Sequence, residues 1–100
     1  MDKGTAIKKA RDYLNEISKI LPYQKAYLFG SHALGFAREE SDIDIGIFVQ
    51  ELNGDYLSVL KSLYKIRRQI DVRIEPHLFI TGKDDSGFSE EVENNGILIQ

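Results

Sequence analysis

Apolar residues recur at spacings of three and four along the first part of the chain. This spacing gathers them on one face of a helix and predicts an amphipathic helix from Thr5, as its N-cap, to Ile20. Pro22 follows and ends the helix. Seven apolar residues are expected to be buried along one face of this helix and just after it, namely Ala6, Ile7, Ala10, Tyr13, Leu14, Ile17 and Leu21.

Two strands separated by a short helix are predicted next. The apolar run Lys25–Phe29 is typical of a buried strand, and the small pair after it allows a sharp turn into a helix at Ser31–Phe36. A loop over Ala37–Ser41 leads into a second strand, Asp42–Val49. This strand is expected to stop near the turn signal Asn53-Gly54.

The second half of the chain returns to a helical pattern and then to strands. A helix is predicted from Asp55, with one face formed by Leu57, Leu60, Leu63, Tyr64 and Ile66. The alternation in Ile70–Ile74 predicts a third strand, closed by Pro76. Ser89–Asn95 is expected to form a short helix, and Ile97–Ile99 a terminal strand or docking segment. We find no internal repeat, so residues 1–100 are predicted to form a single domain.

Composition narrows the class of protein. The 100 residues are 42% hydrophobic, as is ordinary for a globular domain, and they contain no cysteine, which excludes disulfides, thiolate nucleophiles and Cys-based zinc sites. The net charge of −3 argues against a non-specific nucleic-acid binder. No apolar run reaches membrane-spanning length and no signal peptide is apparent, so we expect a soluble, cytoplasmic protein.

A pair of carboxylates stands at the beginning of the second predicted strand. Residues two apart in a strand point to the same side, so Asp42 and Asp44 are expected to face one way while Ile43 faces the other. Two carboxylates side by side repel each other unless a cation lies between them. Mg²⁺ is commonly held by one or two carboxylates together with substrate phosphates, and the pair therefore predicts a metal and nucleotide site.

Two further features complete the predicted site. Gly30 and Ser31 offer close backbone approach, a helix N-terminus and a hydroxyl to bound phosphates. Asp71 stands among apolar neighbours on the third predicted strand, where it either pairs with Arg73, a backbone N–H or water, or joins the first two carboxylates. Three converging carboxylates can hold two divalent cations and support phosphoryl or nucleotidyl transfer, with Asp71 helping to deprotonate the acceptor hydroxyl.

Gly30-Ser31, a gap of ten residues, Asp42-x-Asp44 and the later Asp71 resemble the signature of the DNA polymerase beta-like nucleotidyltransferase superfamily. The small size of the chain resembles that of its minimal nucleotidyltransferase branch. The resemblance implies an α/β (α+β) fold with a small mixed sheet flanked by helices, Mg²⁺ (two ions) as cofactor and ATP as nucleotide donor. By motif position, it assigns the three aspartates to metal and the Gly-Ser pair to the nucleotide phosphates.

The resemblance also implies a partner. Minimal nucleotidyltransferases are commonly encoded beside a helical HEPN-domain protein, and many such pairs are toxin–antitoxin systems in which AMP is added to a tyrosine of the HEPN toxin. The chain is therefore expected to form a hetero-oligomer with a HEPN toxin and to act as its antitoxin.

The sequence departs from the family pattern around the phosphate-binding residues. Many relatives have basic residues directly after the Gly-Ser pair and two positions later, where this chain has His32 and Leu34. His32 either contacts a phosphate or is a neutral residue on the helix surface. Arg38, in the loop before the acidic pair, is expected to supply the missing charge, and Arg73 is a second candidate; each can equally form a solvated or structural ion pair.

Other side chains near the third strand and the aromatic residues are given structural roles. Glu75 and His77 make a possible additional metal pair, but two ligands do not make a site, and loop or edge contacts are preferred for them. Five aromatic residues have the spacing of core residues and are not expected to stack on a base, namely Tyr13, Tyr27, Phe29, Phe48 and Tyr64. Four others, Tyr23, Tyr56, Phe79 and Phe88, are less clearly buried and are assigned either to a partner interface or to the edges of the core.

Three functional hypotheses remain. The first is a Mg²⁺-dependent enzyme that transfers AMP from ATP to a hydroxyl of a partner protein, which the presence of all three carboxylates favours. The second is a non-catalytic antitoxin that neutralises its partner by forming a complex. The third, nucleotide transfer to a small molecule, is disfavoured because 100 residues leave little room for a domain that recognises such an acceptor.

Overall fold

A four-stranded sheet with the order β3-β2-β1-β4 forms the middle of the molecule in the computed structural model, which describes residues 1–100. Strand β1 (Lys25–Phe29) is antiparallel both to β2 (Ile43–Val49) and to β4 (Ile97–Leu98). Strand β3 (Ile74–Ile80) runs parallel to β2. The sheet is therefore mixed, and the predicted fold class is confirmed.

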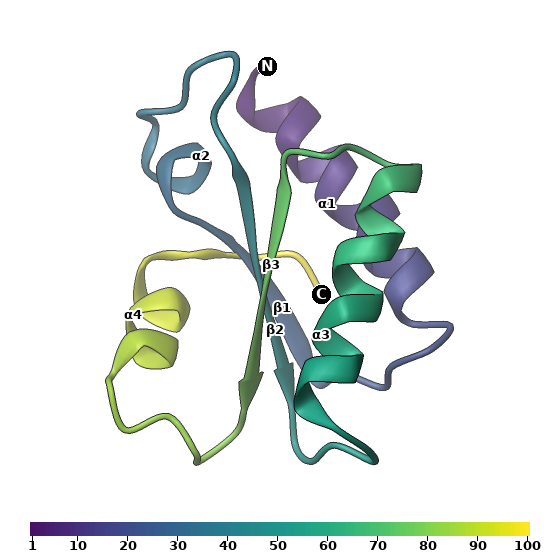
Figure 1. Cartoon of the computed structure of the whole chain (residues 1–100). Coiled ribbons are helices and arrows are strands. Elements are labelled where there is room, and N and C mark those ends of the chain that lie inside the picture. The colour runs from purple at the N-terminus through teal and green to yellow at the C-terminus, as the bar shows by residue number, and fades with distance from the viewer.

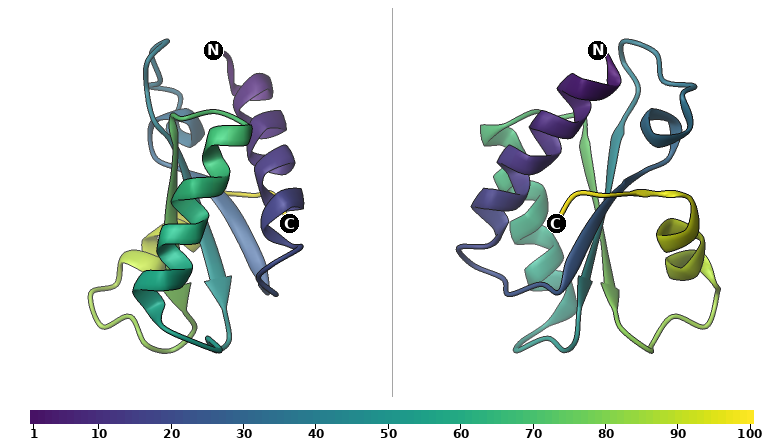
Figure 2. Two further views of the ribbon diagram at one scale, coloured as in Figure 1. Left: turned by 45° about the vertical axis from the view of Figure 1, so that its right-hand side comes forward. Right: turned by 180° about the vertical axis from the view of Figure 1, so that it is seen from behind.

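Helices cover both faces of this sheet (Figure 1). Helices α1 (Lys3–Ile17) and α3 (Tyr56–Ile66) lie against one face, whereas α2 (Ser31–Leu34) and α4 (Phe88–Asn95) lie across the sheet from them, as both views in Figure 2 also show. The main core contains fully buried residues from α1, α3 and three strands, including Leu14, Ile17, Leu28, Ile43, Ile45, Ile47, Leu63 and Ile74. None of the helices is long and apolar enough to cross a membrane.

The first helix begins and ends earlier than predicted. Asp2, not Thr5, is the N-cap, because the Asp2 carboxylate accepts a hydrogen bond from the Thr5 backbone N–H at 2.8 Å. The helix ends at Ile17, so that Ile20 is exposed in the following turn. The apolar spacing nevertheless identified the buried face correctly at Ala6, Ala10, Tyr13, Leu14 and Ile17.

The third strand was misplaced by the sequence analysis. Residues 67–69 form a 3-10 turn after α3, residues 70–73 form no strand, and β3 begins at Ile74. Pro76, predicted to close the strand, lies inside it, and this is possible because β3 is an edge strand that does not need every N–H for pairing. Asp71 consequently lies before the strand.

Helix α4 packs on the second face of the sheet over a glycine. A Cβ built on Gly46 would lie 3.0 Å from Val92 Cγ1, 3.4 Å from Phe79 Cε2 and 3.6 Å from Phe29 Cε1. The absent side chain thus makes room both for α4 and for the neighbouring rings of Phe29, Phe79 and Phe88, which meet edge to face.

Replacing Gly46 by valine is expected to lower the free energy of unfolding by about 1–3 kcal/mol, because the added methyl groups overpack this contact. Urea denaturation followed by circular dichroism measures the effect. Gly4→Ala is the matched control, since its added Cβ meets only Asp2 Oδ1 at 3.6 Å. Equal unfolding midpoints for Gly46→Val and the wild type would contradict the close packing of α4.

Candidate functional site

The end of β1 and the beginning of β2 meet at a glycine. Gly30 follows β1 with φ of 74°, a conformation that favours glycine, and it precedes the short helix α2. Phe29 pairs with Asp44 across the two strands. A Cβ on Gly30 would lie only 2.4 Å from Asp44 Oδ2, so glycine is required for the chain to pass this carboxylate. Two motif residues that are far apart in the sequence are therefore in direct contact.

Asp42 and Asp44 lie on either side of a buried core residue. Asp42 lies directly before β2 and is exposed, Ile43 between them is buried in the core, and the Asp44 side chain is 24% exposed. Asp44 Oδ1 lies 3.2 Å from His77 Nε2 on the adjacent strand. No Lys or Arg forms an ion pair with either carboxylate, so both remain open to a cation.

Glu75, for which the sequence analysis preferred loop or edge contacts, lies in the strand next to Asp44. In the parallel register, Asp44 of β2 pairs with Glu75 of β3, and Gly46 pairs with His77. Glu75 and His77 alternate with the buried residues Ile74, Pro76 and Leu78, so they point away from the core. This alternation would have revealed Glu75 if the strand had been placed at Ile74–Ile80.

Two side chains from the end of α3 and the turn after it contact Glu75. The Tyr64 hydroxyl donates to Glu75 Oε1 at 2.6 Å, and Arg67 Nη1 lies 3.4 Å from Glu75 Oε2. The hydrogen bond to Glu75, burial, and the negative charges of Glu75 and Asp42 together raise the pKa of Tyr64 to about 12. Glu75 is thus held by Tyr64 and Arg67, while its backbone position is in register with Asp44 of β2.

Asp71 does not join these carboxylates in the structure. Its side chain is 7% exposed and is held by Lys9 Nζ at 2.6 Å and by Arg73, whose Nε and Nη2 donate at 3.0 and 2.7 Å. Arg73 also donates to the carbonyl of Glu39 at 2.6 Å. The structural pairing with Arg73, one of the two alternatives for Asp71, is thus observed. Arg73 is itself occupied and is not open to a triphosphate.

Asp71→Asn is expected to destabilise the protein at neutral pH by about 2 kcal/mol, because the variant loses charge-assisted hydrogen bonds from two cations. Hydrogen bonds from Arg73 and Lys9 hold the pKa of Asp71 well below its usual range. A depressed pKa contributes stability above the unfolded-state value near 4 and loses it as the pH falls further.

The difference in unfolding free energy between the wild type and Asp71→Asn should therefore shrink as the pH falls below about 4. Urea titrations at several pH values measure this difference. A gap that stays constant between neutral pH and pH 2 would contradict the ion-pair assignment.

The predicted phosphate-binding residues have different surroundings. Ser31 is partly exposed at the start of α2, and Arg38 is exposed in the loop before Asp42, where its backbone N–H donates to Ser41 Oγ at 2.8 Å. His32 is only 2% exposed and its Nε2 has no hydrogen-bond partner. It is therefore neither a helix-surface residue nor open to a phosphate, and Arg38 is the accessible cation of the motif.

The donor set fits Mg²⁺ bound together with a nucleotide. No three His, Asp or Glu side chains lie close enough to form a complete metal site on their own. Mg²⁺, however, is usually held by only one or two carboxylates, with waters and substrate phosphates filling the remaining positions. Asp42 and Asp44 offer two such oxygen ligands beside a glycine that keeps the adjacent space clear.

Comparison with protein families shows which proteins this chain is similar to. Residues 8–100 match the family model described as "Polymerase beta, Nucleotidyltransferase". The chain is also 32% identical, over 93 residues, to the curated protein MJ0141 of Methanocaldococcus jannaschii, which is provisionally named a protein adenylyltransferase. That alignment covers 89% of this chain and 93% of the relative.

Solved structures share the fold. A crystal structure from Sulfolobus solfataricus, provisionally named a nucleotidyltransferase, matches 96% of this chain and 80% of its own with a TM-score of 0.67 and 21% identity. The crystal structure of a toxin–antitoxin with AMP-PNP matches 100% of this chain and 73% of its own with a TM-score of 0.56 and 20% identity.

Proposed function

Because the chain belongs to the polymerase beta nucleotidyltransferase family and is a nucleotidyltransferase, we propose that it transfers AMP from ATP to a hydroxyl group of a partner protein. The observation that supports this most is the contact between Gly30 and Asp44. It places a backbone that can approach phosphates directly beside a carboxylate that can hold the metal of a metal–nucleotide complex.

The proposed roles follow from the positions of the side chains. Gly30 and Ser31 bind the phosphates, and the exposed Arg38 adds a positive charge at the same end of the sheet. Asp42 and Asp44 hold Mg²⁺, two ions in the full complex, and Mg²⁺ when bound neutralises the charge of the triphosphate. Glu75 is assigned the role of third carboxylate in place of Asp71, because Glu75 lies in register beside Asp44.

The reaction exchanges one phosphorus–oxygen bond for another. The acceptor hydroxyl oxygen attacks the α-phosphorus of ATP, the bond to the β-phosphate breaks, and pyrophosphate leaves. The proton of the hydroxyl passes to a carboxylate of the site, for which Glu75, in register beside Asp44, is the candidate. To accept it, Glu75 has to exchange its contact with Tyr64 or Arg67 for the acceptor hydroxyl. Holding the nucleotide and the acceptor in line is the main contribution of the protein.

We propose a tyrosine of a HEPN-type toxin as the acceptor, which makes this chain the antitoxin of a toxin–antitoxin pair. The named activity of the Methanocaldococcus jannaschii relative supports a protein acceptor, and the toxin–antitoxin structure with AMP-PNP shares the fold. A binding antitoxin without catalysis is the second candidate. The retained pair Asp42 and Asp44, free of Lys or Arg partners, favours the enzyme over it.

Mass spectrometry tests whether a tyrosine of the partner is the acceptor of AMP. The chain is incubated with the product of the neighbouring gene, ATP and Mg²⁺, and the partner is then analysed intact and as peptides. The addition of AMP to a tyrosine of the partner is the expected result. An unmodified partner that nevertheless elutes together with the chain would instead support the binding antitoxin.

A further inference from the structure

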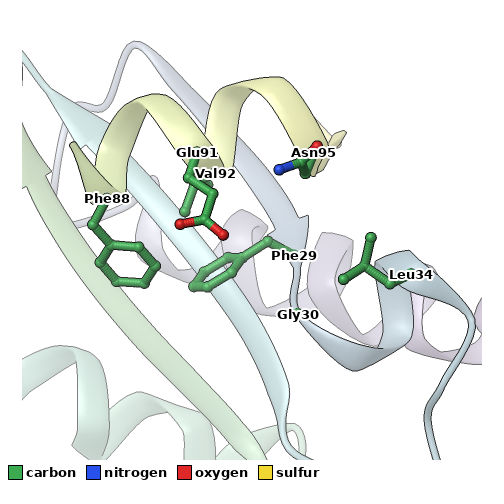
Figure 3. A pocket seen from close by; sticks show the side chains of 7 residues that line it. All are labelled: Phe29, Gly30, Leu34, Phe88, Glu91, Val92 and Asn95. Atoms are coloured by element: carbon green, nitrogen blue, oxygen red, sulfur yellow. The ribbon is translucent and has the colours of Figure 1, made fainter.

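A cavity of about 230 Å³ lies between α4 and α2 on the face of the sheet opposite α1 and α3. Figure 3 shows Phe29 on its floor, Phe88 and Glu91 from α4 on one side, and Asn95 of α4 across from Leu34 of α2. The cavity residues of α4 are spaced three, four and seven positions from Phe88, so one face of that helix forms a wall.

The cavity borders the proposed phosphate site at Gly30. Gly30 lines the cavity and also touches Asp44, so one residue separates the two regions. The volume is below the range of roughly 300–1,000 Å³ typical of pockets that take drug-sized ligands. The cavity is therefore suited to one part of a nucleotide, while the remainder lies over Gly30 and Asp44.

The side chains of the cavity determine which part of a nucleotide enters. Phe29 and Phe88 meet edge to face with ring centroids 5.6 Å apart and offer apolar surface to a planar base. Glu91 is exposed. An ionised glutamate accepts hydrogen bonds but cannot donate them, and its negative charge disfavours a phosphate in the cavity. Asn95, also exposed, has an amide that can both donate to and accept from the edge of a base such as adenine.

We infer that this cavity is the nucleoside subsite of the enzyme, with the base packed against Phe29 and Phe88 and its edge hydrogen-bonded by Asn95. The inference rests on the proposed function and specifies the orientation of the donor. The phosphates lie toward Gly30 and Ser31, and the base lies toward α4. Phe29 then contacts a base, contrary to the sequence-based expectation that it belongs to the core and does not stack on a base. Phe88, which the sequence left to a partner interface or the edge of the core, contacts the base as well.

Isothermal titration calorimetry of the full chain with two probes tests the subsite. AMP-PNP with Mg²⁺ occupies the whole site, whereas inorganic tripolyphosphate with Mg²⁺ occupies only the phosphate region. Phe88→Ala is expected to weaken AMP-PNP binding about tenfold, in keeping with the loss of an aromatic contact to a base, and to leave tripolyphosphate binding unchanged.

Asn95→Ala provides a second test that does not depend on the packing of a ring. Its side chain is exposed, so the fold should be unaffected, and AMP-PNP binding is expected to weaken severalfold. Asn94→Ala is the matched control, because Asn94 is exposed on the same turn of α4 and does not line the cavity. It should bind both probes like the wild type.

Unchanged AMP-PNP affinity in both Phe88→Ala and Asn95→Ala would overturn the subsite while leaving the proposed function intact, provided that the wild type binds AMP-PNP. A parallel loss of tripolyphosphate binding would also overturn it, since the defect would then lie in the phosphate region. Failure of the wild type to bind either probe would count against the proposed function itself.

Discussion

Asp44→Asn is expected to lower nucleotidyl transfer by at least about a hundredfold, because one of the two charges that would hold the metal–nucleotide complex is lost. Asn retains the size and shape of the side chain, and the 3.2 Å contact with His77 Nε2 can be kept by the amide. Asp42→Asn should have an effect of the same order, since Asp42 is exposed and contributes nothing to the core.

Steady-state transfer rates measure the loss of activity, and far-UV circular dichroism shows whether each variant is folded. Asp85→Asn, in the exposed loop before α4, removes the same charge away from the site and is the matched control. The variants at Asp42 and Asp44 should lose activity and keep the wild-type spectrum. Unfolding of either one, or transfer at the rate of the control, would be incompatible with a metal-binding role.

Glu75→Gln is expected to reduce transfer by roughly 10- to 100-fold and to leave the protein folded. Glu75 lies in register with Asp44, and its negative charge contributes to the raised pKa of Tyr64 together with that of Asp42. A glutamine carbonyl can still accept the 2.6 Å hydrogen bond from the Tyr64 hydroxyl, so the loss should be one of charge and not of structure.

Asp71→Asn is the decisive comparison, because the sequence motif favoured Asp71 as the third carboxylate and we propose Glu75 in its place. At a temperature where both variants are fully folded, Asp71→Asn should retain most of its activity and Glu75→Gln should not. The reverse order, with Glu75→Gln active and Asp71→Asn inactive but folded, would restore the original assignment of Asp71.

Most of the fold could be predicted from the pattern of apolar residues. The strand Lys25–Phe29 was predicted with its observed bounds, and the second strand and the terminal helix differ by one residue at their starts. These elements have a clear period and are bounded by glycine or a turn. The contact between Gly30 and Asp44 is likewise the consequence of two strands whose positions were both predicted.

The third strand could not be placed because its local signals were misleading. Ile70, Val72 and Ile74 alternate with polar residues as in a strand, yet Val72 is 66% exposed, and the alternation belongs to a turn. Proline usually ends a strand, and only the position of β3 at the edge of the sheet makes Pro76 acceptable inside it. The role first given to Asp71 followed from that placement.

The cavity could not be predicted because it depends on tertiary packing. The sequence assigned Phe29 to the core, and nothing local indicates that α4 would approach it from the open face of the sheet. The approach depends on Gly46, whose missing side chain lets Val92 and Phe79 come close. Such a contact involves residues from three separate elements.

The most direct test of the central claim is a label-transfer assay with the product of the neighbouring gene as acceptor. ATP labelled at either the α- or the γ-phosphate is supplied with and without Mg²⁺, and Asp42→Asn serves as the inactive control. Nucleotidyl transfer predicts label on the partner from α-labelled ATP only, dependent on Mg²⁺ and absent with the variant. Label from the γ-phosphate, or from neither position while a stable complex forms, would contradict it.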